Sequence, residues 1–398
     1  MLKRRHLLGS ALTSLSLPLP LLSLAASPAA AERRFVFVIL RGGMDGLSAA
    51  PVPGDPAFAE ARGPLAAFAS PVLPLEGPFA LNPLLPQMHA MYGRGELLVV
   101  HATGLTYRER SHFDAQQILE SGGTRPYELA TGWLGRALSL PGGRPAVALQ
   151  TAVPLVLRGS GNGNGNGNGT VDTWAPSVLP EPSPELVARL QAMYRDDPAL
   201  SQALERARGL RGDPAMAGAD AMSSGPGRGA AVALMRQAAE FLQRGKQIAV
   251  LEVGGWDSHA NQAAPQGALS NNLRTLDAML AALRDGLLPA ATWSRTVVLV
   301  ATEFGREVAI NGTQGTDHGS GGVAFVAGGA VNGGRVIADW PGLAKRERFE
   351  GRDLRITTDL RAVQRTILGE HLGVPRAALD AVVLPGSAGL PRLDLLRG

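Results

Sequence analysis

Short apolar runs bounded by glycine recur along the sequence and predict buried β-strands. The first, RFVFVIL at 34–40, combines β-branched and aromatic residues and ends just before Gly42 and Gly43. A continuous apolar run, rather than an alternating one, is typical of a strand that is covered on both faces. Five further runs have this character and lie at 96–100, 145–149, 247–253, 296–302 and 323–329.

Helical patterns separate these runs. The clearest extends from Leu269 to Leu287, where leucines recur at spacings of three and four residues, the period of a helix with one buried face. Strands that alternate with helices predict an α/β fold with a mostly parallel central sheet flanked by helices on both faces. We expect residues 32–398 to form a single domain, with a Gly/Asn-rich loop at 159–170 and a linker-like insert at 212–229.

The first 31 residues have the character of an export signal. A basic segment at 3–5 precedes an apolar run rich in Leu and Ala, and small residues lie before Glu32. The arginine pair is similar to the twin-arginine signal, although Lys3 stands where that signal has Ser or Thr, so ordinary secretion is the alternative. Pro18 and Pro20 interrupt the run and disfavour a retained anchor. We expect a periplasmic or extracellular protein that uses the twin-arginine machinery and keeps no stable membrane anchor.

Charge and cysteine content narrow the chemistry. Removing the signal lowers the formal net charge from +4 to +1, because that segment carries three cations and no anions. No basic stripe with interleaved aromatic residues remains, so a nucleic-acid partner is not expected. The sequence has no cysteine, so any metal must be bound by Asp, Glu, His, Ser or Thr. The segment RGGMDG after the first run also lacks the glycine spacing of a dinucleotide site.

Polar residues gather where the predicted strands end, which is where α/β proteins bind their ligands. Four such segments follow apolar runs: RGGMDG at 41–46, HATG at 101–104, GGWDSH at 254–259 and EFGRE at 303–307. The strongest metal candidates are two Asp/His pairs in glycine-rich segments, Asp257 with His259 and Asp317 with His318.

Other candidates have structural alternatives. Glu303 directly follows a strand, and Arg306 could pair with it or bind an anionic substrate. The segment RERSHFDAQ at 108–116 offers Arg110, Ser111 and His112, but Ser111 could simply cap a helix. Asp45 could be only a turn residue, because Asp followed by Gly favours turns.

Five motifs occur in order along the chain: LRGGMDGLSAAPVPGDPAF, RSHFDAQ, GGWDSHANQ, TEFGRE and GTDHGSGG. Together they resemble the DUF1501 family of exported bacterial proteins over most of the mature chain. That family is similar in turn to the alkaline phosphatase and sulfatase superfamily, whose members hold one or two divalent metals at the carboxyl ends of a parallel sheet. The resemblance implies an alkaline-phosphatase-like fold with one or two divalent ions such as zinc, calcium, magnesium or manganese.

The resemblance also implies residue roles. Metal ligands carried over from it, or offered beside it, are Asp45, Asp257, His259, Glu303, Asp317 and His318. Asp45 is a displaced substitute, since the superfamily's first strand normally ends in a metal-binding Asp, whereas this one ends in Leu40 and Arg41. Ser111 is the best candidate nucleophile, ahead of Thr103 and Thr106.

These roles predict an exported metal-dependent hydrolase of phosphate or sulfate esters, acting on a small-molecule or glycan ester. Ser111 and His112 are its candidate catalytic residues, and Arg110 or Arg306 would hold the ester oxygens. The alternative is a non-catalytic cell-envelope binding protein that retains the fold and a structural metal. The displaced first-strand Asp and the uncertain nucleophile favour this alternative.

Overall fold

The computed structural model describes residues 32–159, 171–176, 182–211, 228–262 and 264–397. The predicted export signal at 1–31, most of the Gly/Asn-rich loop and most of the linker-like insert therefore lie outside the described residues. Among the described residues, none of the helices combines the length and the apolar character needed to span a bilayer.

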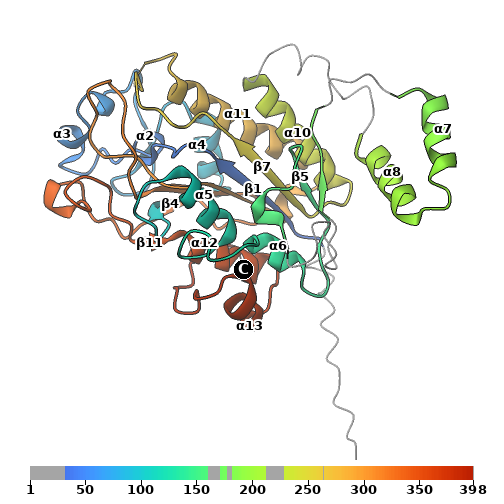
Figure 1. Ribbon diagram of the computed structural model, residues 1–398. Coiled ribbons are helices and arrows are strands. Elements are labelled where there is room, and N and C mark those ends of the chain that lie inside the picture. The colour runs from blue at the N-terminus through green and yellow to red at the C-terminus, as the bar shows by residue number, and fades with distance from the viewer. Residues whose placement is uncertain (1–31, 160–170, 177–181, 212–227, 263, 398) are drawn as a thin grey trace, which may run out of the picture.

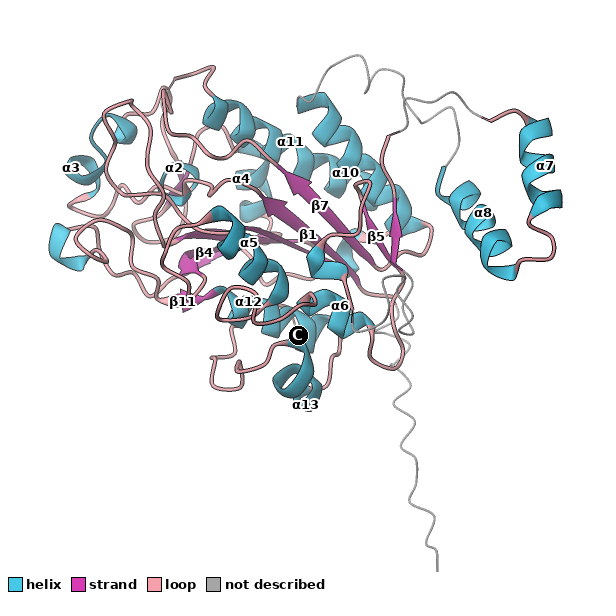
Figure 2. Cartoon of the chain, in the orientation of Figure 1, coloured by secondary structure: helices cyan, strands magenta, loops and turns pink. Residues whose placement is uncertain are grey.

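A nine-stranded sheet forms the centre of the described chain (Figure 2). Its order is β10-β4-β9-β8-β1-β7-β5-β6, with β11 paired to β4. The strands are β1 (Arg34–Leu40), β4 (Leu97–Gly104), β5 (Ala146–Ala148), β6 (Val171–Thr173), β7 (Ile248–Val253), β8 (Thr296–Thr302), β9 (Gly322–Ala327), β10 (Arg335–Ile337) and β11 (Thr358–Asp359). A separate hairpin pairs β2 (Leu73–Pro74) with β3 (Ala80–Leu81). All six predicted strands are present.

The sheet is parallel except at β9, which runs antiparallel to both of its neighbours, β4 and β8. The central strands end in register, because Leu40 lies beside Val253 on one side and Thr302 on the other. The segments that follow β1, β7 and β8 therefore leave the sheet side by side. The antiparallel strand β9 begins at this same edge, so the segment before it joins them.

Helices cover both faces of the sheet, as predicted (Figure 1). One layer contains α4 (Pro86–Gly93), α10 (Arg228–Gln243) and α11 (Ala268–Leu287), and the other contains α5 (His112–Ser121), α6 (Trp133–Leu138) and α12 (Leu360–Thr366). Each layer packs on the sheet to form a hydrophobic core, the first under α4, α10 and α11 and the second under α5, α6 and α12. Side chains of β1 alternate between them: Val36 and Val38 lie in the first core, and Phe35 and Phe37 lie in the second. The other α-helices within the described residues are α2 (Gly46–Ala49), α3 (Phe58–Arg62), α7 (Pro184–Met193), α8 (Pro198–Arg211) and α13 (Arg376–Ala378).

The second core should depend strongly on Phe37. This side chain is fully buried, and its ring centroid lies 5.5 Å from that of Trp133. We expect Phe37→Ala to lower the free energy of unfolding by about 3–5 kcal/mol, because it removes buried contacts and leaves a cavity. Chemical denaturation measures this loss. The matched control is Phe113→Ala, since Phe113 is 81% exposed and its loss should cost less than about 0.5 kcal/mol. Similar losses in both variants would contradict the predicted core.

Candidate metal centre

Three segments that are distant in sequence meet at the carboxyl edge of the sheet. His112 is the first residue of α5, which follows β4. Asp257 and His259 lie in the loop after β7, and His318 lies in the loop before β9. The last of these reaches the edge only because β9 is antiparallel, so that its amino end lies where the other strands have their carboxyl ends.

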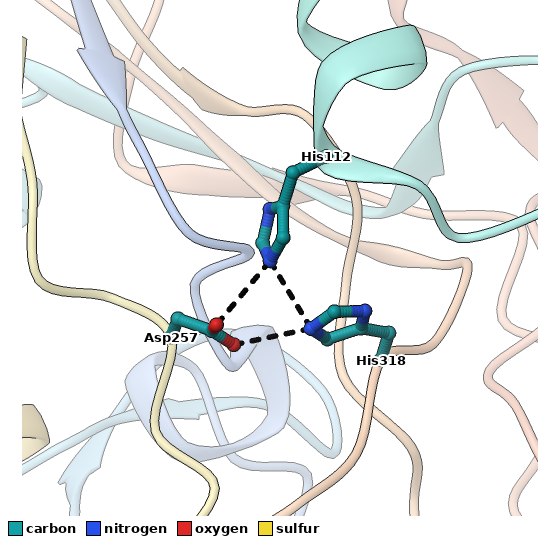
Figure 3. Close-up of side chains that lie close together, drawn as sticks. All are labelled: His112, Asp257 and His318. Carbon is teal, nitrogen blue, oxygen red and sulfur yellow. Dashed lines mark hydrogen bonds and ion pairs between the residues drawn. The ribbon is translucent and has the colours of Figure 1, made fainter.

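Three of these side chains could hold one metal ion: His112, Asp257 and His318, whose ligand atoms all lie within 4.8 Å of one another. Figure 3 shows them pointing toward one another from separate segments. The Nε2 atoms of His112 and His318 are 3.1 Å apart, and Asp257 approaches them at 3.4 Å and 3.2 Å. Ligand atoms that share an ion at about 2.0–2.1 Å are themselves roughly 3.0–3.4 Å apart, so these separations fit.

His259 joins the same cluster from the other side. Its Nε2 lies 3.0 Å from Nε2 of His318 and 2.9 Å from Oδ1 of Asp257. The triangle formed by His259, Asp257 and His318 thus shares an edge with the triangle formed by His112, Asp257 and His318. We refer to these four residues as the His/Asp cluster.

The outer nitrogen of each imidazole faces an oxygen that can only accept a hydrogen bond. Nδ1 of His112 donates to Glu303 at 2.8 Å, Nδ1 of His259 to Asp317 at 3.1 Å, and Nδ1 of His318 to the carbonyl of Arg110 at 3.0 Å. The Nδ1 atoms must therefore carry the protons, which leaves the Nε2 lone pairs facing inward. With neutral rings, the Nε2 lone pairs and the Asp257 carboxylate lie on the inside of the cluster; Arg306 donates to Oδ1 of Asp257 from one side, and a bound cation would satisfy the remaining lone pairs.

The surroundings shift the pKa values of the cluster in different directions. The Glu303 hydrogen bond raises the pKa of His112. Burial, followed by the charge of His112, lowers the pKa of His318. Burial alone would raise the pKa of Asp257, but the Arg306 guanidinium, together with the charges of His259 and His318, outweighs burial and lowers it. Asp257 and His318 are therefore unprotonated near neutral pH, as metal ligands must be.

Glu303 does not take the direct ligand position that the sequence analysis proposed. The structure places it behind His112, fully buried, where Oε1 accepts hydrogen bonds from His112, Gln116 and the backbone N–H of Gly42. Oε2 accepts from the Thr302 hydroxyl. With both oxygens engaged, Glu303 orients His112 rather than facing the centre of the cluster. Asp317 has the corresponding position behind His259, and the Asn311 amide lowers its pKa.

Asp45 is also placed away from the His/Asp cluster. It is 1% exposed and forms a buried ion pair with Arg62 at 2.5 Å. Its two oxygens accept further hydrogen bonds from Ser48 and Gln262. An ion pair of this kind saturates the carboxylate, so the proposed ligand role of Asp45 is not supported.

Both candidate substrate-binding arginines form ion pairs with carboxylates. Arg110 pairs with Glu350 at 2.7 Å and with the buried Asp353 at 2.9 Å. Arg306 is fully buried and donates to Asp257 at 2.6 Å. Both guanidinium groups thus have carboxylate partners in place of the predicted ester oxygens; Arg110 also contributes its carbonyl to His318, and Arg306 holds Asp257.

Of the two predicted catalytic residues, the structure places His112 within the His/Asp cluster. Ser111 lies next to it at the N-cap of α5, but its side chain makes no capping hydrogen bond, so the simple capping alternative does not explain it. The sequence predicts a catalytic role for His112 and no role as a metal ligand; the carboxylate nearest to it along the helix, Asp114, accepts a hydrogen bond from Tyr107 instead. Thr103 instead donates to the carbonyl of Thr358.

Glycines allow these loops to approach one another closely. A Cβ on Gly305 would lie 1.8 Å from the carbonyl oxygen of Gly321, and one on Gly319 would lie 2.4 Å from the carbonyl carbon of Arg306. A Cβ on Gly315 would lie 2.2 Å from the backbone of His259. The glycine-rich motifs are therefore required by backbone contact between the loops that carry the cluster.

The fold and the cluster together define an α/β protein with a candidate metal centre at the carboxyl edge of its sheet. The chain belongs to the DUF1501 family, described as a protein of unknown function, whose model matches residues 119–380. This confirms the family predicted from the motifs. The matched residues contain Asp257, His259 and His318, whereas His112 lies before them.

Among solved structures, the chain is similar to the PsFucS1 sulfatase from Pseudoalteromonas sp., with 12% identity and a TM-score of 0.43 over 88% of this chain and 69% of that one. It is also similar to the phosphonate monoester hydrolase of Agrobacterium radiobacter, with 12% identity and a TM-score of 0.39 over 86% and 74%. A protein of the alkaline phosphatase superfamily from Vibrio parahaemolyticus is similar as well, with 10% identity and a TM-score of 0.38 over 85% of this chain and 66% of that one. No curated protein matches. Function must therefore be inferred from the cluster itself.

The pair formed by His112 and Glu303 should make metal affinity depend on pH. Because Glu303 raises the pKa of His112 above its ordinary value of 6.5, a proton competes with the metal for Nε2 at mildly acidic pH. We expect Zn²⁺ affinity to fall from about pH 8 to about pH 6, with the His112 transition above 6.5. Competition with a chromogenic chelator at each pH measures this Zn²⁺ affinity.

The matched variant is Glu303→Gln, which keeps the shape of the side chain but removes its charge. The transition should move to lower pH, and affinity at high pH should fall by about 10–100-fold. An unchanged transition in this variant would show that Glu303 does not control His112.

Proposed function

We propose that the protein is an exported metal-dependent hydrolase of phosphate or sulfate esters. The observation that carries the proposal is the convergence of four acceptor atoms in the His/Asp cluster, each imidazole being held by an oxygen behind it. The cluster is accessible, since the side chains of Asp257 and His259 are each 43% exposed. A bound divalent ion would lower the pKa of a coordinated hydroxyl or water and neutralise charge on the ester.

Residues of the chain would bind the ion, supply the nucleophile and orient the ligands. His112, His318 and Asp257 would hold the ion, with His259 completing the set or holding a second one. Ser111 would supply the attacking hydroxyl, since it adjoins His112 and its side chain is not used to cap α5. Arg306 would keep Asp257 ionised and oriented. Zinc and manganese suit this donor set of imidazole and carboxylate, and no thiolate is present to select a softer metal.

Export is proposed from the N-terminal sequence. The basic segment at 3–5 and the apolar run that follows it would direct the chain to the twin-arginine machinery and then to the periplasm or the exterior. Its substrate, a small-molecule or glycan ester, would be encountered in that compartment.

One observation favours the second candidate, a non-catalytic cell-envelope binding protein with a structural metal. Arg110 and Arg306, which would have held the non-bridging oxygens of an ester, are both paired with carboxylates. In that role the His/Asp cluster would stabilise the three segments that carry it, and the exposed surface around it would bind a glycan or a partner protein.

Asp257→Asn should abolish metal retention and ester turnover while leaving the fold intact. The substitution removes the carboxylate that both triangles of the cluster share. Elemental analysis of purified protein should find about one or two equivalents of metal in the wild type and a clear loss in the variant. The control is Asp285→Asn, because the Asp285 side chain is 75% exposed and lies on α11. Undiminished metal content in Asp257→Asn would refute the site.

Ser111→Ala separates the two candidate functions. If Ser111 is the nucleophile, turnover of phosphate or sulfate esters should fall by about a thousandfold or more, because a covalent route is lost, while metal content stays the same. Steady-state kinetics with aryl phosphates and aryl sulfates would measure the change. Full activity in the variant would exclude Ser111, and no activity in the metal-loaded wild type toward either ester class would favour the binding protein.

A further inference from the structure

We infer that a buried relay of hydrogen bonds runs from Asp45 through Gln262 and Thr316 to Arg306, and that it positions Asp257 in the His/Asp cluster. The inference rests on the proposed function only in treating the cluster as a metal site. It assigns a role to two motif residues that the metal centre leaves unexplained, Asp45 of GGMDG and Gln262 of GGWDSHANQ.

The relay is anchored by the ion pair between Asp45 and Arg62. Both side chains are at most 1% exposed, and Arg62 also donates to the carbonyl of Val308 at 2.8 Å. Removing two charges from water costs several kcal/mol per ion, so such a pair adds little net stability by itself. It does fix the position and the charge of Asp45 inside the protein.

The direction of each hydrogen bond in the relay follows from its neighbour. The Asp45 carboxylate can only accept, so it must face the amide nitrogen of Gln262. The Gln262 oxygen then points the other way and accepts from the Thr316 hydroxyl at 2.7 Å and from the Ser258 hydroxyl at 2.9 Å. Because the Thr316 hydroxyl donates its only proton to Gln262, its oxygen can accept a hydrogen bond from Nε of Arg306, at 3.1 Å.

Every bond therefore donates toward Asp45, an arrangement in which neighbouring hydrogen bonds strengthen one another. Thr316 holds Arg306 at a second point as well, because its carbonyl accepts from Nη2. With Nε and Nη2 fixed, the planar guanidinium has one orientation, and Nη1 points at Oδ1 of Asp257.

Asp257 needs this support because it is partly exposed, whereas the relay behind it is buried. Its side chain is 43% exposed, while Arg306 is fully buried and Thr316 is 0% exposed. A carboxylate in water samples several rotamers, and ordering it costs entropy unless a fixed partner holds it. Thr316 and Gln262 are thus positioning residues, which act on the metal site through Arg306 without touching it.

Thr316→Val tests the relay, because valine has the shape of threonine but no hydroxyl. We expect it to weaken Zn²⁺ binding by about tenfold, while Thr316→Ser, which keeps the hydroxyl, stays within about threefold of the wild type. The matched control is Thr296→Val: Thr296 is equally buried and donates to the carbonyl of Thr292 at 2.8 Å, but it lies at the far end of β8, about 20 Å from the cluster edge. The control should lose stability but keep its Zn²⁺ affinity. Equal Zn²⁺ losses in both valine variants, or none in Thr316→Val, would overturn the relay.

A second measurement does not need the metal. In metal-free protein, Thr316→Val and Asp257→Asn should shift the midpoint of denaturant unfolding by less when combined than the sum of their separate shifts, because each breaks the same connection. Additive shifts would overturn the relay. If the shifts of the variants are coupled but the wild-type protein binds no Zn²⁺, the relay is upheld and the proposed function is refuted instead.

Discussion

Four acceptor atoms face one another at the carboxyl edge of the sheet, and most features of this region follow from that conflict. Nε2 of His112 and Nε2 of His259 each lie 2.9–3.4 Å from Nε2 of His318 and from the Asp257 carboxylate, and these groups repel one another unless a proton or a cation lies between them. The conflict is built in, since each ring is turned inward by an oxygen that accepts its outer proton. The fold thus holds an arrangement that a bound cation would stabilise.

The sheet brings the cluster together by a simple topological device. In a parallel sheet only the segments after the strands reach the carboxyl edge, which accounts for Asp257 after β7 and Glu303 after β8. Reversing one strand, β9, adds a segment that precedes a strand, and this segment carries His318. Glycines at 305, 315 and 319 then let the loop backbones touch. A side chain at any of them would push apart the loops that hold the ligands.

The sequence predicted the fold and part of the cluster, for identifiable reasons. Buried strands such as β1 and β8 are long apolar runs, whereas β6, β10 and β11 are two or three residues long and leave no periodicity to read. Asp257 and His318 were found because polar residues in glycine-rich loops at strand ends are conspicuous. Glu303 was expected to be a direct ligand because a ligand and the carboxylate that orients a ligand are the same residue type in the same motif. Only packing separates the two roles.

The same reasoning explains why so many charges are buried beside this edge. Glu303, Asp45, Arg62 and Arg306 are each at most 1% exposed, and burying ions is costly unless they are paired and hydrogen-bonded. Two of them contact a cluster residue directly, Glu303 bonding to His112 and Arg306 to Asp257, while Asp45 and Arg62 pair with each other. A protein that needed only stability could replace them with apolar side chains of similar volume. Their presence next to four converging acceptors is instead what a site requires when its ligands must be held in one orientation before the ion arrives.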